Sequence, residues 1–362
     1  MIQGFHIPVP LPASPMSLAP EIQKKVTQSQ LSLERLNQLI NTFENPKVLI
    51  RPVMRKEAHS TSAIEGIHTP YEKLISGLFV ENEDETLIEV SNFMEAAEFA
   101  IDQIMINDKI DAQFMKSIHK ELFIGLSRWK NKNGKFREIN VQIENANGYL
   151  FYPMEHGEDL NAAIKELNQW FLKTKSWDPI VAIAAYHYQF EAIHPFEDGN
   201  GRIGRLILIL QLYAKGLLDY PILDLSTWLK SKKYLYHQGF QKVTENRDWD
   251  FHVGVIAAAI QGSADNLIGD IEELIRLQQF EREKVKRSFR SHSRAIEVID
   301  LAFTEIEITV PQVSMQLGIS FKSANALVSK LVAIGSLSPI GAAVYERRFK
   351  NQPLFEYAQR GF

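Results

Sequence analysis

Twelve consecutive residues, 194 to 205, combine several groups that can do chemistry, and they read HPFEDGNGRIGR. The His194 side chain titrates near neutral pH and can act as a general base. Asp198 offers hard oxygen ligands, which suit Mg2+. Arg202 and Arg205 are three residues apart, so they share one face of a helix, and their guanidinium groups match phosphate oxygens. The stretch therefore predicts a polyphosphate site beside a general base.

The sequence around this stretch predicts a loop between two core helices. Asp178 and Pro179 are typical of a helix start, and Pro195 should end that helix near His194. A second helix is expected from about Gly201, and it is apolar on nearly every side, so it should lie in the centre of the fold. The loop glycines would then lie at a helix N-terminus, where free N–H groups and the helix dipole favour an anion.

Each of these residues taken alone has an ordinary structural explanation. A histidine at a helix end is commonly structural, an acid before an asparagine commonly caps a turn, and two arginines can pair with acids on a neighbouring helix. These explanations do not account for all of the groups meeting on one loop at the start of a buried helix. We therefore favour a functional site over a structural one.

The stretch also resembles the signature of the Fic family, HPFx(D/E)GN(G/K)RxxR, and matches it at every fixed position. The resemblance extends over roughly residues 95 to 260. Most members of this family transfer AMP from ATP to a hydroxyl group of a protein. The resemblance therefore implies a mainly α-helical Fic core with a β-hairpin flap, protein adenylyltransferase activity, ATP as substrate and Mg2+ as cofactor.

The resemblance also implies roles for the residues of the signature. His194 would deprotonate a Ser, Thr or Tyr hydroxyl of the target protein, and Asp198 would hold Mg2+ at the α- and β-phosphates. Arg202 would contact the β-phosphate region, and Arg205 would hold the γ-phosphate. Phe196 would anchor the loop in the core. The anion hole would be formed by Gly199, Asn200 and Gly201.

Residues 134 to 153 predict a β-hairpin within the helical core, because apolar and polar residues alternate before a turn rich in Gly and Asn. The alternating apolar residues are Ile139, Val141 and Ile143. The resemblance makes this hairpin the flap, which would bind the target by strand addition. Ile143 and Glu144 would lie at its active-site end.

An aromatic pair that flanks adenine in the family aligns with Tyr236 and His237. The family often has tyrosine at both positions, so His237 departs from the pattern. The pair has two open explanations, which are contact with adenine and simple packing in the core.

Residues 61 to 66, TSAIEG, resemble the inhibitory motif of the family, (S/T)xxxE(G/N). Thr61 and Glu65 are one helical turn apart and share a face. A carboxylate and a γ-phosphate cannot both occupy the guanidinium of Arg205, so the resemblance implies auto-inhibition by competition. The motif precedes the core, as in class II members of the family. In some relatives the same glutamate instead helps to remove AMP, and a plain surface position is the structural alternative.

The C-terminal part has a different character. A long helix or two, with a basic stretch from 282 to 294, is followed by a helix–turn–helix pattern and two strands that could form a wing. This predicts a winged-helix domain with its recognition helix from about Phe321 to Ile334. That helix carries only Lys322 and Lys330 as cations, so a protein partner or a homodimer is favoured over DNA. The cations of the wing are Arg347, Arg348 and Lys350.

Composition limits the protein class. The chain has 362 residues, a formal net charge of −4 at pH 7 and no cysteine. The missing cysteine excludes disulfides, thiolate metal sites and a cysteine nucleophile. The charge predicts no overall attraction to nucleic acid or to an acidic membrane. The N-terminus lacks the pattern of a signal peptide, and the most apolar stretch is too short to cross a bilayer, so we expect a cytoplasmic protein.

We expect four regions along the chain. They are an N-terminal helical region with the inhibitory motif (1–95), the Fic core (96–262), a helical linker (263–294) and the winged helix (295–362). The main alternative to an adenylyltransferase is a transcription regulator whose core only senses a nucleotide, although a sensor has no need of a base at His194. A phosphotransferase of the Doc type is disfavoured, because that branch carries a lysine where this chain has Gly201.

Overall fold

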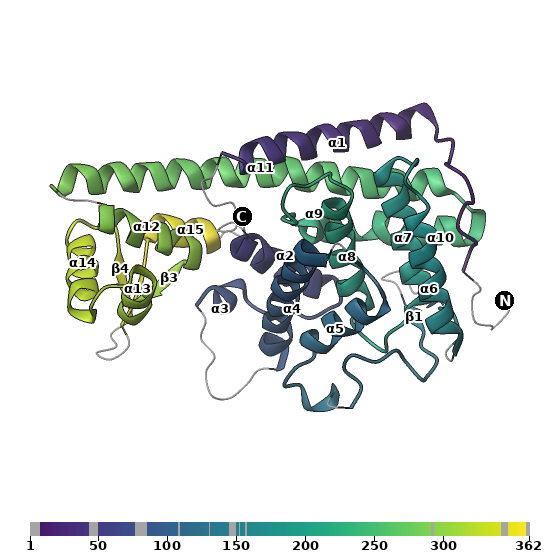
Figure 1. The fold of residues 1–362 in the computed structure, drawn as a ribbon, viewed down its shortest axis with the longest axis horizontal. Helices are drawn as coiled ribbons and strands as arrows, with labels where there is room; N and C mark the ends of the chain where they lie inside the picture. Colours follow the sequence, from purple (N-terminus) through teal and green to yellow (C-terminus); the bar gives the residue numbers. More distant parts are fainter. Residues whose placement is uncertain are drawn as a thin grey trace. The chain divides into compact units, whose positions relative to one another are not determined.

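The computed structural model describes the greater part of the chain as helices (Figure 1). The described residues are 8–42, 50–76, 85–107, 109–129, 131–144, 150–151, 153–155, 158–290, 293–341 and 347–359. The chain divides into two compact units, one within residues 1–69 and 82–266 and the other within 70–81 and 267–362. In the described part, no helix combines the length and the hydropathy needed to span a bilayer.

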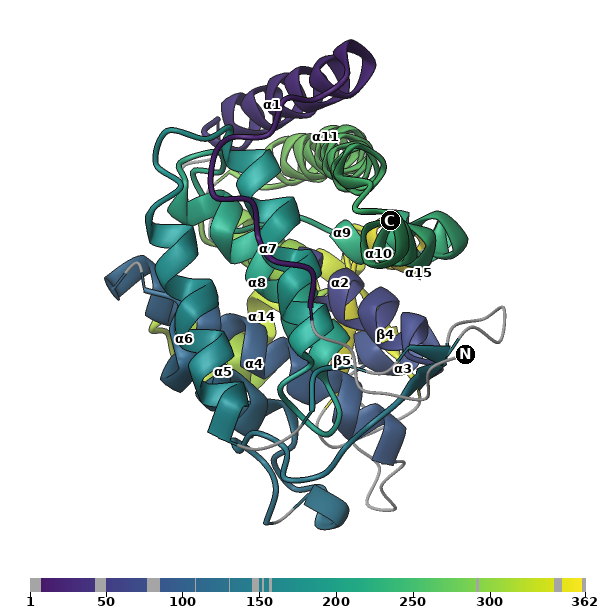
Figure 2. The ribbon, with the colours of Figure 1, turned by 90° about the vertical axis from the view of Figure 1, so that its right-hand side faces the viewer.

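The first unit is a set of helices packed around α8 (Asn200–Ala214), which contacts α2, α4, α5, α7 and α9 (Figure 2). Every residue from Arg202 to Leu212 is buried. This confirms the prediction of a central helix that is apolar on nearly every side. The other helices of this unit are α1 (Pro20–Ile40), α2 (Ile50–Ile64), α4 (Glu85–Asn107), α5 (Ala112–Leu122), α6 (Glu158–Leu172), α7 (Pro179–Ile193), α9 (Leu225–Ser231), α10 (Lys233–Asn246) and the start of α11 (Trp249–Ser288).

Helix α7 begins and ends where the sequence predicts. The side chain of Asp178 accepts a hydrogen bond from the backbone N–H of Ile180 at 3.0 Å, and Pro179 occupies the first turn. The helix ends at Ile193, and His194 follows in the left-handed conformation with φ 51°. The functional loop therefore starts at a sharp change of backbone direction.

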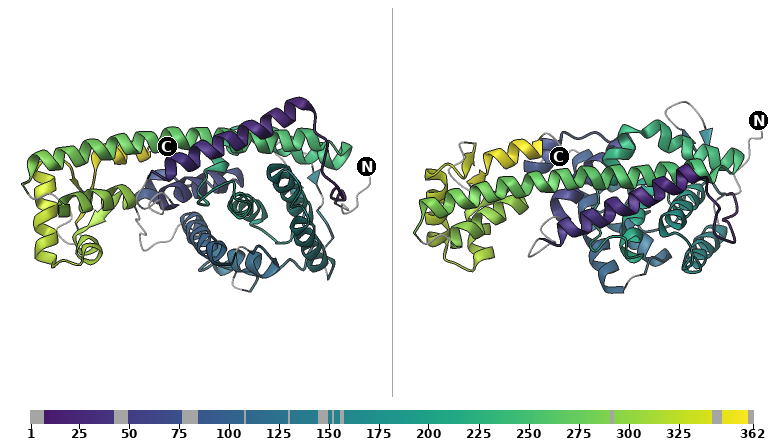
Figure 3. Two further views of the ribbon diagram at one scale, coloured as in Figure 1. Left: turned by 45° about the horizontal axis from the view of Figure 1, so that its top comes forward. Right: turned by 90° about the horizontal axis from the view of Figure 1, so that it is seen from above.

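Helix α1 lies alongside the first part of α11 (Figure 3). The backbone N–H of Ala19 donates to Asp250 at 2.9 Å, and the hydroxyl of Ser32 donates to Asp265 at 2.8 Å. The predicted helix after Pro20 is confirmed.

The hairpin is shorter than its sequence predicts. Strand β1 (Ile143–Glu144) pairs with β2 (Leu150–Phe151) in antiparallel register, with Ile143 opposite Phe151. The prediction that a strand begins near Ile139 is wrong, since residues 139–142 form no strand. The carbonyl of Ile139 instead accepts a hydrogen bond from Arg137 at 2.9 Å, so this backbone is tied to a side chain and not to a partner strand.

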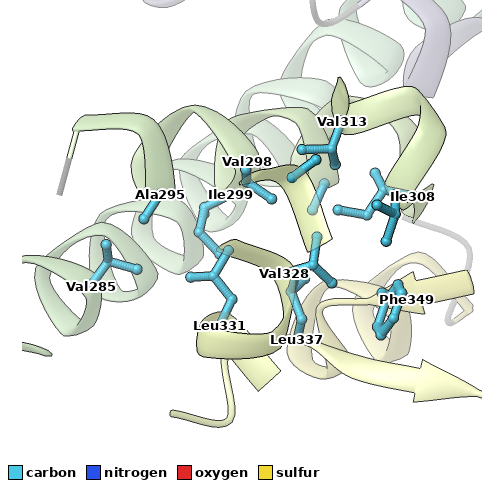
Figure 4. Close-up of a cluster of buried hydrophobic side chains, with 13 residues drawn as sticks. Val285, Ala295, Val298, Ile299, Ile308, Val313, Val328, Leu331, Leu337 and Phe349 are labelled. Atoms are coloured by element: carbon cyan, nitrogen blue, oxygen red, sulfur yellow. The ribbon is translucent and has the colours of Figure 1, made fainter. Parts of the chain in front are cut away.

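The second unit has its own core (Figure 4). Its helices are the end of α11 with α3 (Tyr71–Ser76), α12 (Ser293–Glu305), α13 (Val310–Leu317), α14 (Phe321–Ala333) and α15 (Gln352–Gln359). A three-stranded antiparallel sheet, ordered β3-β5-β4, completes it, with β3 at Glu307–Thr309, β4 at Ser338–Ile340 and β5 at Arg348–Lys350. The predicted helix–turn–helix and two strands are present, whereas β3 and α15 are additional elements.

Part of the basic stretch on α11 packs against this unit. Arg282 pairs with Asp300 of α12 at 2.6 Å, and Lys284 donates to the carbonyl of Gly335 at 2.8 Å. Val285 is fully buried in the core. The residues that the sequence assigns to a linker are therefore continuous with α11 up to Ser288. The division into four regions stays a prediction.

Candidate active site

The loop between α7 and α8 is folded by its own asparagine. The Asn200 side chain accepts a hydrogen bond from the backbone N–H of Phe196 and donates one to the carbonyl of the same residue, both at 2.8 Å. Gly199 adopts φ 81°, a region that favours glycine. Because the Asn200 amide closes the loop, the group it offers to an anion is its backbone N–H at the start of α8.

Phe196 anchors this loop, as predicted, and it is fully buried. His119 of α5 stacks on its ring with a centroid distance of 4.2 Å. Burial lowers the pKa of His119 to about 3, and its Nδ1 accepts a hydrogen bond from Gly134 at 2.8 Å, so the ring is neutral. His119 therefore supports the loop as an uncharged packing residue.

His194 is held in the form that a base requires. Its Nδ1 faces the backbone carbonyl of Glu191 at 3.3 Å. With the proton on Nδ1, Nε2 is left as the acceptor. The pKa of His194 is lowered to about 4, mainly by burial, with Glu65 opposing the shift and Arg137 adding to it. The ring is therefore neutral at physiological pH and can accept a proton.

Arg137, in the segment before the hairpin, ties the hairpin region to the loop. Its Nε donates to the carbonyl of His194 at 2.8 Å, and its Nη2 donates to the carbonyl of Met154. Its backbone N–H donates to the carbonyl of Pro195 at 2.9 Å. No local sequence pattern indicates this role of Arg137.

Arg202 is fully buried and pairs with a carboxylate that the sequence pattern does not indicate. Its Nη1 lies 2.6 Å from Glu89 of α4, which also pairs with Arg128 at 2.6 Å. Its Nη2 lies 3.4 Å from Asp198. The cavity beside the loop is lined by Arg205 but not by Arg202. The expected contact of Arg202 with a phosphate stays a prediction.

Arg205 meets the predicted inhibitory motif directly. Its Nη2 lies 2.6 Å from the Glu65 carboxylate, and its Nε donates to the hydroxyl of Thr61 at 2.8 Å. Glu65 also lies so close to Gly201 that a side chain there would collide with it. Burial raises the pKa of Glu65, but Arg205 outweighs this, and the net pKa lies below the ordinary value. An ionised carboxylate thus covers the start of α8.

The helix that carries this motif is docked by a series of polar contacts. Glu57, which is fully buried, accepts hydrogen bonds from the backbone and the hydroxyl of Ser226 on α9. Lys56 pairs with Asp224 at 3.1 Å. Lys233 donates to the carbonyl of Ile64 at 2.5 Å, at the end of α2. The position of Glu65 is therefore fixed by contacts along α2 as well as by Arg205.

A cavity of about 130 Å³ lies between α7, α8 and α10. The predicted residues that line it are Glu65, Ile143, His194, Gly201, Arg205, Tyr236 and His237. The hydroxyl of Tyr236 is 2.8 Å from Nε2 of the buried His187, so this tyrosine has a packing partner as well as a place on the wall. The side chain of Glu144 lies outside the described residues, and its backbone belongs to β1.

Asp198 fits the expected magnesium ligand. Its carboxylate is partly exposed, at 42% of the side chain, and Oδ1 accepts a hydrogen bond from Gly199 at 2.5 Å. No group of three ligand side chains gathers in the described part of the chain. Mg2+ in phosphate-transfer sites commonly takes one or two carboxylates and completes its shell with phosphate oxygens and water. The single carboxylate of Asp198 on this loop is compatible with that arrangement.

Comparison with known proteins gives the family. The model of the Fic/DOC family matches residues 109–212, and that of the Fic/DOC family N-terminal region matches residues 23–102. This chain belongs to the Fic/DOC family.

Its relatives include proteins named as adenylyltransferases. A probable protein adenylyltransferase of Aquifex aeolicus is 41% identical over 56 residues, which are 16% of this chain and 18% of that protein. The protein adenylyltransferase Fic of Culex quinquefasciatus is 29% identical over 134 residues, which are 36% of this chain and 25% of that protein. The similarity therefore spans a quarter or less of the length of these relatives.

Solved structures support the fold. A Fic family protein from Desulfovibrio desulfuricans aligns with a TM-score of 0.63 at 20% identity, over 94% of this chain and 98% of that one. Fic-1 from Caenorhabditis elegans aligns with a TM-score of 0.54 at 21% identity, over 70% of this chain and 75% of that one.

Proposed function

We propose that this chain is a protein adenylyltransferase that transfers AMP from ATP to a Ser, Thr or Tyr hydroxyl of a target protein. The observation that carries the proposal is the neutral His194 beside the N-terminus of α8, with Arg205 one turn further along the same helix. This arrangement joins a proton acceptor to an anion site. The names of the relatives support the same activity.

The triphosphate of ATP would lie over the first turn of α8. The backbone N–H groups of Asn200 and Gly201 would donate to its oxygens, and Arg205 would hold the γ-phosphate. Asp198 would hold Mg2+, which supplies positive charge against the phosphates when it is bound. Placing the reactants and neutralising their charge would give most of the catalysis, as in other phosphoryl-type transfers.

In the transfer step, Nε2 of His194 takes the proton of the target hydroxyl. The hydroxyl oxygen forms a bond to the α-phosphorus, and the bond from that phosphorus to the bridging oxygen breaks. Pyrophosphate leaves with the bonding electrons. The flap strand β1 would align the target by pairing with an extended segment, because its edge offers backbone groups at Ile143.

We propose that Glu65 inhibits this reaction, in the class II arrangement of the family. Its carboxylate lies 2.6 Å from Nη2 of Arg205. It therefore takes the place that the γ-phosphate would need. With Glu65 in place, ATP could bind only in a pose without its usual γ-phosphate contact. The resting chain should therefore have weak activity.

The direct test is labelling with ATP that carries a radioactive α-phosphate, in a cell lysate. The Glu65→Gly variant should label protein at least about tenfold more than the parent chain, because Arg205 becomes free for the γ-phosphate. His194→Ala in the Glu65→Gly background should abolish the label. A Glu65→Gly chain that binds ATP but labels nothing would instead favour a nucleotide-sensing regulator.

Removal of AMP from a target is a second candidate, favoured by one observation. Glu65 lines the cavity as an ionised carboxylate, so it could activate a water molecule for attack on a protein-bound AMP. Incubation of a labelled target with the parent chain decides between the two. Loss of label with the parent chain, and retention with Glu65→Gly, would support removal.

We also propose that the second unit is a winged helix. The helices α13 and α14 with the β3-β5-β4 sheet support this assignment. Because α14 carries only Lys322 and Lys330 as cations, we assign the unit to docking a protein partner or a second copy of the chain. A gel shift with random duplex DNA that weakens with salt would contradict the protein-docking role.

A further inference from the structure

One buried carboxyl group in the cavity has no role in the mechanism above. Glu191 lies on α7, one turn before His194, and its side chain is 13% exposed. Its Oε1 is buried and has no hydrogen-bond partner among the described residues. A buried polar atom without a partner is costly. Because Oε1 is closed off against Gly204 of α8, the oxygen that a ligand in the cavity could reach is Oε2.

The place of Glu191 in the cavity shows which part of a nucleotide it would meet. One group of lining residues, Gly201 and Arg205, can bind an anion. A second group is aromatic and contains Tyr236 and His237, the pair predicted to contact adenine, with Tyr188 and Phe240. A nucleotide with its phosphates at the first group and its base at the second would have its ribose between them.

Glu191 is close to members of both groups. Its Oε1 packs so closely against Gly204 of α8 that a side chain at that position would collide with it. Its Oε2 is 3.8 Å from Nδ1 of His194. On α7 it is one turn from Tyr188 of the aromatic group. The carboxyl group thus neighbours the helix that carries the anion group and the helix that carries part of the aromatic group.

Three other polar side chains of the wall are already bonded to protein groups. Thr244 pairs with the hydroxyl of Tyr188 at 3.1 Å, and Gln241 donates to Glu245 at 3.0 Å. The hydroxyl of Tyr236 lies 2.8 Å from His187. His237 also lines the cavity, but it belongs to the pair predicted to contact adenine, which leaves Glu191 as the candidate for the sugar.

Its protonation state suits a site beside a triphosphate. The pKa of Glu191 is raised to about 8, mainly by burial, with Arg205 opposing the shift and Glu65 adding to it. A neutral carboxyl group does not repel phosphates, and it has both a donor and an acceptor. A pair of ribose hydroxyls presents the same two functions.

We propose that Glu191 binds the ribose hydroxyls of the nucleotide and makes the enzyme select ribonucleotides over deoxyribonucleotides. This inference rests on the proposed function, since it takes a nucleoside triphosphate as the substrate. It adds a specificity-determining contact to the site.

The test is binding of ATP, 2′-deoxy-ATP and 3′-deoxy-ATP to the full chain carrying Glu65→Gly. At least one deoxynucleotide should bind about five- to tenfold more weakly than ATP, the range expected for one or two hydrogen bonds. Glu191→Met should remove this preference. Glu191→Gln, which keeps a donor and an acceptor, should retain most of it.

Two further measurements separate a ribose contact from a structural role. Tripolyphosphate, which has no sugar, should bind the Glu191→Met chain as well as it binds the Glu65→Gly parent. The exposed Glu34 on α1 provides the matched control, and Glu34→Met should leave the preference unchanged. Loss of tripolyphosphate binding in Glu191→Met would show that the residue only supports the phosphate site and would overturn the assignment.

The outcomes also separate this inference from the proposed function. Equal binding of ATP and both deoxynucleotides would overturn the ribose contact and leave the adenylyltransferase proposal intact. No binding of any nucleotide would overturn both.

Discussion

At the scale of single residues, the site combines groups whose charges are set by burial and by pairing. His194 is neutral, Glu65 is ionised, and Arg205 stays charged because it is paired. These states agree with the chemistry proposed for each side chain. They also follow from position in the fold, because an isolated histidine or glutamate of the same sequence would titrate near its ordinary pKa.

The low pKa of His194 predicts how activity depends on pH. Since the base is already deprotonated above about pH 5, labelling by Glu65→Gly should stay nearly constant from pH 7.5 down to about 5.5. It should fall only as the pH approaches the pKa of His194, which is about 4 in the parent chain and lower in Glu65→Gly, because Glu65 raises it. Initial rates of labelling across this range provide the measurement. A fall with a midpoint near 6.5, the ordinary histidine value, would contradict it.

The buried pair of Arg202 and Glu89 predicts a stability effect. Glu89→Gln would remove the buried counter-charge of Arg202 and leave only the partly exposed Asp198 at 3.4 Å, and loss of a buried partner typically costs about 3–5 kcal/mol. The measurement is the free energy of unfolding in urea. Asp102→Asn, at an exposed position on the same helix, is the matched control and should change it by less than about 0.5 kcal/mol. Equal effects of the two changes would rule out this role for the pair.

At the scale of elements, local sequence signals gave the ends of the helices that present the site. Asp178, Pro179 and Pro195 mark the bounds of α7, and the glycines mark the start of α8, so both were predictable. The length of the hairpin was not, because Arg137 redirects the backbone near Ile139 through contacts that no local pattern encodes.

Helix α2 provides a second prediction at this scale. Lys233 donates to the last carbonyl of α2, where a positive charge also favours the helix dipole. Lys233→Met should therefore loosen the segment that ends in Glu65 and raise basal labelling by about two- to fivefold, which is less than the effect of removing Glu65 itself. The neighbouring Lys232 is exposed, and Lys232→Met is the control. Labelling that is unchanged by Lys233→Met would argue against docking of α2 as part of the inhibition.

At the scale of the whole molecule, the residues missed by sequence reasoning are those paired over long separations. Glu89 meets Arg202, and Arg137 meets the loop at His194. Helix α3 packs with α15 although the two are far apart in the chain. A single sequence shows residue types and spacing, whereas these pairs form only when the chain folds. The signature residues were therefore predictable, and the residues that hold them in place were not.

The shared use of Arg205 has a thermodynamic consequence for the resting protein. If Glu65 and the γ-phosphate exclude each other from one guanidinium, each must weaken the other by the same factor. ATP should then act on α2 as a releasing ligand, whereas ADP, which has no γ-phosphate, should not. Amide hydrogen exchange in residues 60–66 should accelerate with ATP and not with ADP. Equal exchange with both nucleotides would mean that Glu65 and the γ-phosphate do not compete for Arg205.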